Sequence, residues 1–199
     1  CQALAMKSDA LGRDIATLQE PHAGTVAFGR INWTAREAHS LVTQDKSAKT
    51  TFIKIMIRYY VDVRQRWKTT RDRRLTGGGA LVARLMIALK QRKVQIRLST
   101  ALQDYIVENG RVVGAVVSSD GLTQRIRAAK GVIVASGGFE RNPQMRAKHL
   151  PQPTTTAWAA GVPSNTGEPI VAAMRIGVAM GNLDSAWWTP GFKLCDEDR

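Results

Sequence analysis

The sequence predicts an α/β fold, in the form of an α+β fragment, and three observations lead to this class. Stretches with apolar residues at helical spacing alternate with stretches typical of strands. Two dipeptides typical of hairpins, Asn109-Gly110 and Asp120-Gly121, join three consecutive strand candidates. The run "GVIVA", residues 131–135, has no polar alternation, which is typical of a strand buried on both faces of a parallel sheet.

The first 75 residues are expected to be mainly helical. A helix begins within residues 1–24 and stops before Pro21, and the stretch "TVAFGRINW" that follows is strand-like or extended. Thr34 and Glu37 form a capping box that starts a helix at Ala35, and a longer helix runs from Ser47 to about Thr70. The apolar residues of that longer helix predict a stripe that packs in the core: Phe52, Ile53, Met56, Ile57, Tyr60, Val61 and Trp67.

A glycine run opens the next segment, "TGGGALVARLMIALKQRKV", which continues as an amphipathic helix. Gly77-x-Gly79 is not a dinucleotide fingerprint, because Val82 occupies the third glycine position and "RRL" precedes it instead of a strand. The helix is followed by a strand, "VQIRL", and by a three-stranded antiparallel meander. The meander strands are "LQDYIVE", "RVVGAVVSS" and "LTQRIRAA".

Beyond the buried strand, the sequence predicts short helices joined by a connector. Asn142 caps a helix with Pro143 in its first turn, and this helix ends near Leu150. A Thr-, Pro- and Ala-rich connector leads to a second helix, which begins at Pro169 and continues to Gly181. The last predicted element is the extended stretch "LDSAWWTPGF".

Charge and composition exclude several classes of protein. The net charge is +13, and 12 Lys and Arg against two Asp lie between Arg58 and Arg97. Without a recognised nucleic-acid motif, we interpret this block as a solvated helix face and a connector, and we expect no nucleic-acid partner. No apolar run is long enough to span a bilayer, so we expect a soluble, cytoplasmic protein. Neither cysteine has neighbours at ligand spacing, and no metal site is expected.

Four stretches, taken together in this order, resemble a known family. They are "GGGALVARL", "VQIRLSTALQDYIVENGRVVGAVV", "GVIVASGGFERNPQMRAKHLP" and "NTGEPIVAAMRIGVAMGNLDSAWWTP". The set resembles the FAD-dependent flavoproteins of the succinate dehydrogenase and fumarate reductase family. Within that family it is most similar to the 3-ketosteroid Δ1-dehydrogenase branch. The resemblance covers about residues 76–190.

The resemblance implies a partial FAD/NAD(P)-binding Rossmann-like domain with a β-meander, a helical segment and the start of a cap (catalytic) domain. It divides the chain into a helical segment of the FAD-binding domain (1–75), the core of that domain (76–150), and a connector with the flavin-side helix and the start of the cap domain (151–199). The family's GxGxxG unit, which holds the FAD pyrophosphate at a helix N-terminus, is not found in this sequence. Glu168-Pro169 also replaces the family's Asp-Gly, which removes one backbone N–H from that loop.

Site residues follow from the matching positions. The pair Gly137-Gly138 exposes backbone that a flavin's linking chain can approach, although such a pair can also make a tight strand-to-helix turn. Thr166 matches the flavin-side loop and can also serve as a helix cap, and Trp187 and Trp188 are expected to pack in a core or between domains. The positions that the resemblance implies for cofactor binding are Ala101, Leu102, Ala135, Ser136, Gly137, Gly138, Asn165, Thr166, Gly167 and Glu168.

The resemblance implies a fragment of an FAD-dependent oxidoreductase acting on CH–CH bonds, with hydride transfer between a substrate carbon and flavin N5. The implied substrate is a steroid-like enone or a fumarate-like dicarboxylate. The family's catalytic positions have no match in this sequence, so we name no catalytic residue and expect the 199-residue chain alone to be inactive and to bind FAD weakly or not at all. Exposed apolar surface predicts homo-oligomers. The alternative function is that of a non-catalytic basic module that binds an anionic partner.

Overall fold

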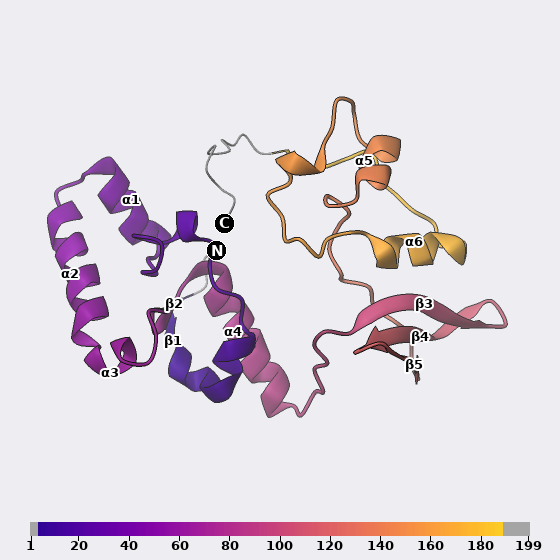
Figure 1. Cartoon of the computed structure of the whole chain (residues 1–199), viewed down its shortest axis with the longest axis horizontal. Helices are drawn as coiled ribbons and strands as arrows, with labels where there is room; N and C mark the ends of the chain where they lie inside the picture. The colour runs from indigo at the N-terminus through magenta and orange to yellow at the C-terminus, as the bar shows by residue number, and fades with distance from the viewer. Residues whose placement is uncertain (1–3, 189–199) are drawn as a thin grey trace. The chain divides into compact units, whose positions relative to one another are not determined.

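The computed structural model describes residues 4–188 and divides the chain into two compact units, residues 1–96 and residues 97–199. Figure 1 shows the elements of each unit along the chain. The division falls inside the range 76–150 that the sequence assigns to one domain, and the three-part division stays a prediction. Helices dominate the first unit, and the second unit is built on a sheet.

The first unit joins a short two-stranded ladder to a set of helices. Strand β1 (Met6–Lys7) pairs antiparallel with β2 (Arg74–Leu75), which brings the start of this unit beside the chain that enters α4. The other elements of the unit are η1 (Ser8–Thr17), η2 (Ala23–Thr25), α1 (Ala35–Thr43), α2 (Ala48–Val61), α3 (Val63–Arg66) and α4 (Gly77–Gln91).

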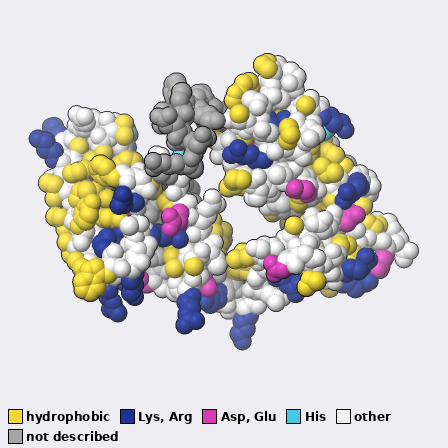
Figure 2. Space-filling view, in the orientation of Figure 1, with side chains coloured by type: hydrophobic (Ala, Val, Ile, Leu, Met, Phe, Trp, Pro, Cys, Tyr) yellow, Lys and Arg dark blue, Asp and Glu magenta, His cyan; other side chains and the backbone are white. Residues whose placement is uncertain are grey.

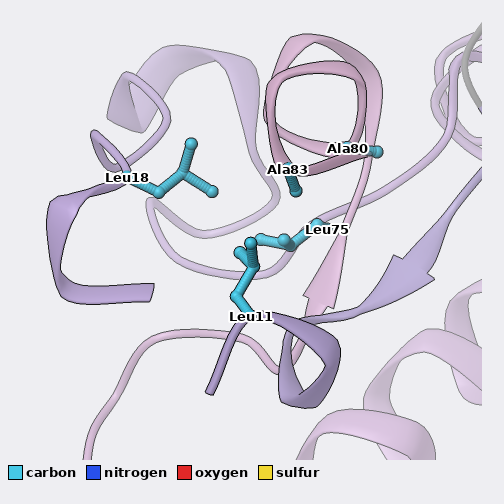
Figure 3. Close-up of a cluster of buried hydrophobic side chains, with 5 residues drawn as sticks. All are labelled: Leu11, Leu18, Leu75, Ala80 and Ala83. Atoms are coloured by element: carbon cyan, nitrogen blue, oxygen red, sulfur yellow. The ribbon is translucent and has the colours of Figure 1, made fainter. Parts of the chain in front are cut away.

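Two small clusters of buried apolar side chains form the core of this unit. The first contains Leu11, Leu18 and Leu75, which lie beside Ala80 and Ala83 of α4 (Figure 3). The small alanine side chains let α4 approach η1 closely. The members of the second cluster come from the turn before α1 and from α2: Ala27, Ile31, Ile55 and Tyr59.

Local signals in this unit are confirmed, and two predicted elements are wrong. Thr34 caps α1 as predicted, because its hydroxyl accepts from the N–H of Glu37 and the Glu37 carboxylate accepts from the N–H of Thr34. The helix predicted within residues 1–24 is a 3₁₀ helix interrupted at Gly12, whose φ of 58° is outside the helical region. The stretch predicted to be strand-like or extended, residues 25–33, is instead a turn closed by a bridge between Ala27 and Ile31.

The apolar stripe predicted for α2 does not pack in the core. Ile55 and Tyr59 are buried, whereas the predicted stripe is exposed except for the half-buried Met56. The helix also ends at Val61, and α3 continues only to Arg66. On α4 it is likewise small residues that are buried, Ala80 and Ala83, whereas Leu81, Leu85 and Leu89 are exposed and Met86 is half-buried.

Arginines from the basic block hold the first unit together. Arg71 donates to the carbonyls of Ile15 and Leu18 at 3.0 and 2.9 Å, and Arg74 donates to the Glu37 carboxylate at 2.8 Å. Asp72 is 5% exposed and accepts from the N–H groups of Asn32 and Arg74 at 2.9 Å each. The interpretation of this block as a solvated face is therefore wrong for these side chains.

Glu37 illustrates how these contacts affect a carboxylate. Burial tends to raise the pKa of Glu37, but hydrogen bonds from Arg74 and Thr34 outweigh it and hold the pKa below its ordinary value. The Arg58 guanidinium lies 3.6 Å from the same Glu37 carboxylate, and it also lies 3.7 Å from the Asp72 carboxylate. Glu37 is therefore both part of the capping box of α1 and a partner of two arginines.

The second unit is built on the predicted meander. Strands β3 (Ala101–Glu108), β4 (Arg111–Ser119) and β5 (Leu122–Arg127) form an antiparallel sheet in the order β3-β4-β5. Positive φ at Asn109, Gly110, Asp120 and Gly121 confirms both hairpin turns. Helix α5 (Pro143–His149), the short helix η3 (Thr156–Trp158) and α6 (Glu168–Arg175) complete the unit.

Helix α6 packs on β3 through a small core. Ala172 and Ala173 of α6 bury Tyr105 of β3, and Leu102 and Val132 pack against this cluster. Burial, together with the nearby Asp104 carboxylate, raises the pKa of Tyr105, and its hydroxyl donates to the carbonyl of Pro169 at 3.2 Å. This contact fixes the start of α6 over the sheet. The helix ends at Arg175, earlier than predicted.

Two predicted strands do not form within residues 4–188. Residues 94–98 and 131–135 belong to no sheet in this range, and Ile133 is 95% exposed. The prediction that residues 131–135 are buried on both faces is therefore wrong for the described chain. A parallel strand needs neighbours from distant parts of a sequence, and the strands described here pair only antiparallel, in the β1-β2 ladder and in the β3-β4-β5 meander. Trp187 is 98% exposed, so its predicted packing is not seen here either.

Candidate cofactor-binding site

The candidate site begins at the glycine pair that follows residues 131–135. Gly137 has a φ of 80°, in the region that favours glycine, and a Cβ added there would lie 2.5 Å from Oδ1 of Asn165. The structure therefore brings two of the predicted stretches into contact, although 28 positions of the numbering separate these residues. A side chain at position 137 would displace Asn165.

Backbone donors are available at this turn. Ala135, Ser136 and Gly137 are exposed and Gly138 is half-buried. Among residues 4–188, the N–H groups of Ser136, Gly137 and Gly138 donate to no protein acceptor. Free N–H groups on a glycine turn are suited to donate hydrogen bonds to the oxygens of a phosphate-containing linker. The side chains nearest to an added Cβ are that of Asn165 at Gly137 and that of Glu140 at Gly138.

Three side chains after the glycine pair connect this turn to residues 161–168. Glu140 accepts from Nδ2 of Asn165 at 2.6 Å, and Arg141 donates to the carbonyl of Gly161 at 2.7 Å. Nδ2 of Asn142 donates to the carbonyl of Thr166 at 2.8 Å. Sequence reasoning assigned no role to Glu140 or Arg141. The sequence feature that could have pointed to them is the run of polar residues 140–142, one position after the glycine pair, because polar side chains near a turn can bind a second loop.

Asn142 performs two tasks at once. Its Oδ1 accepts from the N–H of Met145 at 2.9 Å and caps α5 as predicted, with Pro143 in the first turn. Because its Nδ2 is bonded to the carbonyl of Thr166, the start of α5 and the loop before α6 share one side chain. Asn142 therefore links the two loops directly.

Close packing leaves no room for a side chain at Gly167. It is buried with a φ of 77°, and a Cβ there would lie 2.7 Å from Cβ of Phe139 and 2.8 Å from Sδ of Met145. Gly167 is also the N-cap residue of α6. The interpretation of Thr166 as the cap is therefore wrong, and its hydroxyl instead contacts the Glu168 carboxylate. Glu168 is exposed in the first turn, next to Pro169.

Ala101 and Leu102 open β3 and pair with Ser118 and Val117 of β4. Ala101 is exposed, while Leu102 is half-buried in the cluster beneath α6. Val132, near the start of the segment that leads to the glycine pair, packs against the same cluster. The three stretches that hold the expected cofactor positions, 101–102, 135–138 and 165–168, thus adjoin one small core. Their contacts with the cofactor stay predictions.

The arrangement fits a bound dinucleotide cofactor better than it fits chemistry by the chain's own side chains. It offers backbone N–H groups, a glycine that a Cβ would block, and an amide at Asn165. Within residues 4–188, no group of three or more His, Cys, Asp or Glu side chains could hold a metal ion. None of the described helices is long and apolar enough to cross a bilayer.

Comparisons with known proteins agree with this geometry. The family model described as "FAD binding domain" matches residues 11–194. The chain is 44% identical over 140 residues to a 3-oxosteroid 1-dehydrogenase of Mycolicibacterium smegmatis, covering 67% of this chain and 25% of that protein. It is 39% identical over 141 residues to the 3-oxosteroid 1-dehydrogenase of Comamonas testosteroni, covering 70% of this chain and 25% of that protein.

A solved structure matches almost the whole chain. It is the 3-ketosteroid Δ1-dehydrogenase of Sterolibacterium denitrificans in complex with 1,4-androstadiene-3,17-dione, with a TM-score of 0.93 and 39% sequence identity. The match covers 98% of this chain and 36% of that one. The chain thus spans a quarter to about a third of the length of these relatives. Because the family model matches residues 11–194 of the 199 in this chain, the chain belongs to the FAD-binding-domain family of flavoprotein oxidoreductases, whose cofactor is FAD.

Proposed function

We propose that the chain supplies part of the FAD-binding domain of a 3-ketosteroid dehydrogenase-type enzyme. The observation that carries the proposal is the contact between Gly137 and Asn165, which joins two stretches assigned to the cofactor and leaves backbone donors exposed. Relatives about 40% identical act on 3-oxosteroids by their names, which favours a steroid-like enone over a dicarboxylate as substrate. The cytoplasm is the proposed location.

In this proposal the chain's residues position the cofactor. FAD, when bound, would act as the acceptor of a hydride from a substrate carbon. The N–H groups of Ser136, Gly137 and Gly138 would bind its linking chain, with the loop Asn165, Thr166, Gly167 and Glu168 beside them and Ala101 and Leu102 at the edge of the sheet. Glu140 orients Asn165, and α6 holds the loop on β3. The catalytic acid and base would come from outside residues 1–199.

The alternative of a basic binding module has little support. It rested on the basic block, but Arg58, Arg66, Arg71, Arg73 and Arg74 donate to backbone carbonyls or carboxylates within the first unit. Guanidinium groups engaged in this way offer fewer free charges to a phosphate backbone. The FAD-binding family assignment therefore stands without a second function.

The test is FAD binding by the full-length protein as its gene encodes it. We expect this protein to bind FAD, and Gly137→Ala to weaken binding at least about tenfold by displacing Asn165. Gly121→Ala is the matched control, because Gly121 has a φ of 77° but a Cβ there meets nothing within 4 Å. Equal loss in both variants, or wild-type affinity in Gly137→Ala, would refute the site.

A further inference from the structure

Glu140 is a half-buried carboxylate without a cationic partner in the described chain. Acids are the scarcer charged residues, with 16 Asp and Glu against 29 Lys and Arg, and Figure 2 shows them scattered among basic side chains. Glu37 and Glu108 form ion pairs with arginines. Among residues 4–188 the carboxylate of Glu140 forms no ion pair. It accepts instead from Nδ2 of Asn165, a neutral amide, at 2.6 Å.

Two glycines leave room for the pair formed by Glu140 and Asn165. A Cβ added at Gly161 would overlap Oε1 of Glu140 and would lie 2.9 Å from its Cδ. A Cβ added at Gly137 would lie 2.5 Å from Oδ1 of Asn165. Gly161 is not among the glycines with positive φ, so this position requires glycine for space and not for conformation. The backbone on both sides is therefore fitted to this pair of side chains.

The contact with Glu140 decides which end of the Asn165 amide faces the glycine turn. An ionised carboxylate only accepts hydrogen bonds, so the amide nitrogen has to face Glu140. Oδ1 then lies toward Gly137, at 2.5 Å from the added Cβ, against 3.1 Å for Nδ2. Asn165 is half-buried, and its Oδ1 accepts no hydrogen bond from another described residue. Without the carboxylate, either end of the amide can turn toward the glycine pair.

This end of the glycine turn offers donors and acceptors together. The donors are the N–H groups of Gly137 and Gly138, and the acceptors are Oδ1 of Asn165 and the Glu140 carboxylate, whose Oε2 lies 3.1 Å from a Cβ added at Gly138. Phosphate oxygens carry negative charge and would be repelled by both acceptors. A hydroxyl group donates and accepts, so it can bond to both kinds of partner. The chain that links the two rings of FAD carries hydroxyls as well as phosphates.

We propose that Glu140 is a positioning residue for the cofactor. It holds the carbonyl oxygen of Asn165 toward Gly137, so that this end of the site accepts a hydrogen bond from a hydroxyl of the FAD linking chain and does not face a phosphate. Glu140 acts through Asn165, and Gly161 keeps its carboxylate in place. This inference rests on the proposed function and names the part of FAD that meets the glycine turn.

The test is FAD binding by the full-length protein as its gene encodes it, measured by titration of flavin fluorescence. We expect Glu140→Ala to weaken binding about fivefold, the share of one oriented hydrogen bond. Glu140→Gln should bind within about twofold of the wild type, because the glutamine carbonyl can still accept from Asn165. The matched control is Glu108→Ala, which removes a carboxylate bonded to Arg127 at 2.7 and 2.8 Å and should bind FAD like the wild type.

Double variants test whether Glu140 acts through Asn165. Glu140→Ala with Asn165→Ala should bind FAD no more weakly than Asn165→Ala alone, because the carboxylate then has no amide to hold. Gly161→Ala should weaken binding about fivefold by displacing the carboxylate, and should add no further loss to Glu140→Ala. Gly181→Ala is its matched control, since Gly181 also lacks a positive φ and a Cβ there meets nothing within 4 Å. Additive losses in either pair would overturn the positioning role.

Two fragments of FAD, used as competitors, identify the hydroxyl. Riboflavin carries only the ribityl hydroxyls, and ADP carries the ribose hydroxyls together with phosphates. We expect Asn165→Ala to weaken the binding of one fragment about fivefold and to leave the other unchanged. Loss with both fragments or with neither would overturn the assignment. So would tighter binding of ADP, which is the result expected when a phosphate faces the carbonyl of Asn165.

The same measurements separate the role of Glu140 from the cofactor site itself. If the wild type does not bind FAD, or if Gly137→Ala binds it like the wild type, the proposed function is refuted, and this inference with it. If Gly137→Ala weakens binding and Glu140→Ala does not, the site stands and the role of Glu140 is refuted. Equal loss in Glu140→Gln and Glu140→Ala would also refute that role, because the glutamine can still hold the Asn165 amide.

Discussion

Substitution of Gly167 by alanine separates backbone strain from close packing at the candidate site. Gly167 and Gly177 flank α6 and have nearly equal φ, 77° and 80°. An alanine costs about 1 kcal/mol at either position because of the left-handed conformation. At Gly167 the added Cβ also meets Phe139 and Met145 within 2.8 Å, and such overpacking costs about 1–3 kcal/mol more. Nothing lies within 4 Å of a Cβ at Gly177.

Urea unfolding of the second unit, followed by hydrogen exchange of α6, measures the difference between the two variants. We expect Gly167→Ala to lower the free energy of unfolding by about 2–4 kcal/mol and Gly177→Ala by about 1 kcal/mol. The exchange of α5 should also increase in Gly167→Ala, because Met145 belongs to α5. If both variants lose the same stability, close packing of Phe139 and Met145 against α6 is not what requires the glycine.

Two further predictions concern single side chains. Asn142→Ala should lose both the cap of α5 and the hydrogen bond to Thr166, which together lower the free energy of unfolding by about 2 kcal/mol. Asn142→Asp keeps the cap and should lower it by about 1 kcal/mol. Hydrogen exchange of α5 distinguishes the two variants, and equal protection in both would contradict this prediction. Glu37 has a lowered pKa, so its contribution to stability is complete above the ordinary glutamate value near pH 4.3 and is lost as the pH falls through the lowered pKa. Urea midpoints measured against pH should therefore fall less steeply in Glu37→Gln, and an unchanged slope would be evidence against the carboxylate's role.

Local signals predicted the structure well where neighbours in the sequence decide it. The capping box at Thr34, the cap at Asn142 and the two hairpin turns each depend on residues within a few positions, and all are confirmed. Faces of helices were harder to predict, because an apolar stripe does not tell which part of the chain will cover it. On α2 the buried side chains, Ile55 and Tyr59, lie beside the predicted stripe.

The strand predictions were wrong where a strand would need a partner from a distant part of the sequence. Residues 94–98 and 131–135 have the composition of strands, but no strand of the described chain pairs with them. At the candidate site, the resemblance named both Gly137 and Asn165, and the structure places them in contact. The role of Glu140 could not be predicted, because it depends on where the loop at Gly161 and Asn165 returns.

The arginines of the first unit have a practical consequence for anyone who engineers this protein. Arg71 reaches two carbonyls with two different nitrogens, and Arg66 does the same with the carbonyls of Thr70 and Arg71. A lysine has a single ammonium and cannot reproduce this fork, so an exchange that keeps the charge would still remove a cross-link. Attempts to lower the isoelectric point of about 10.4 should begin with exposed lysines such as Lys46 and leave these guanidinium groups in place.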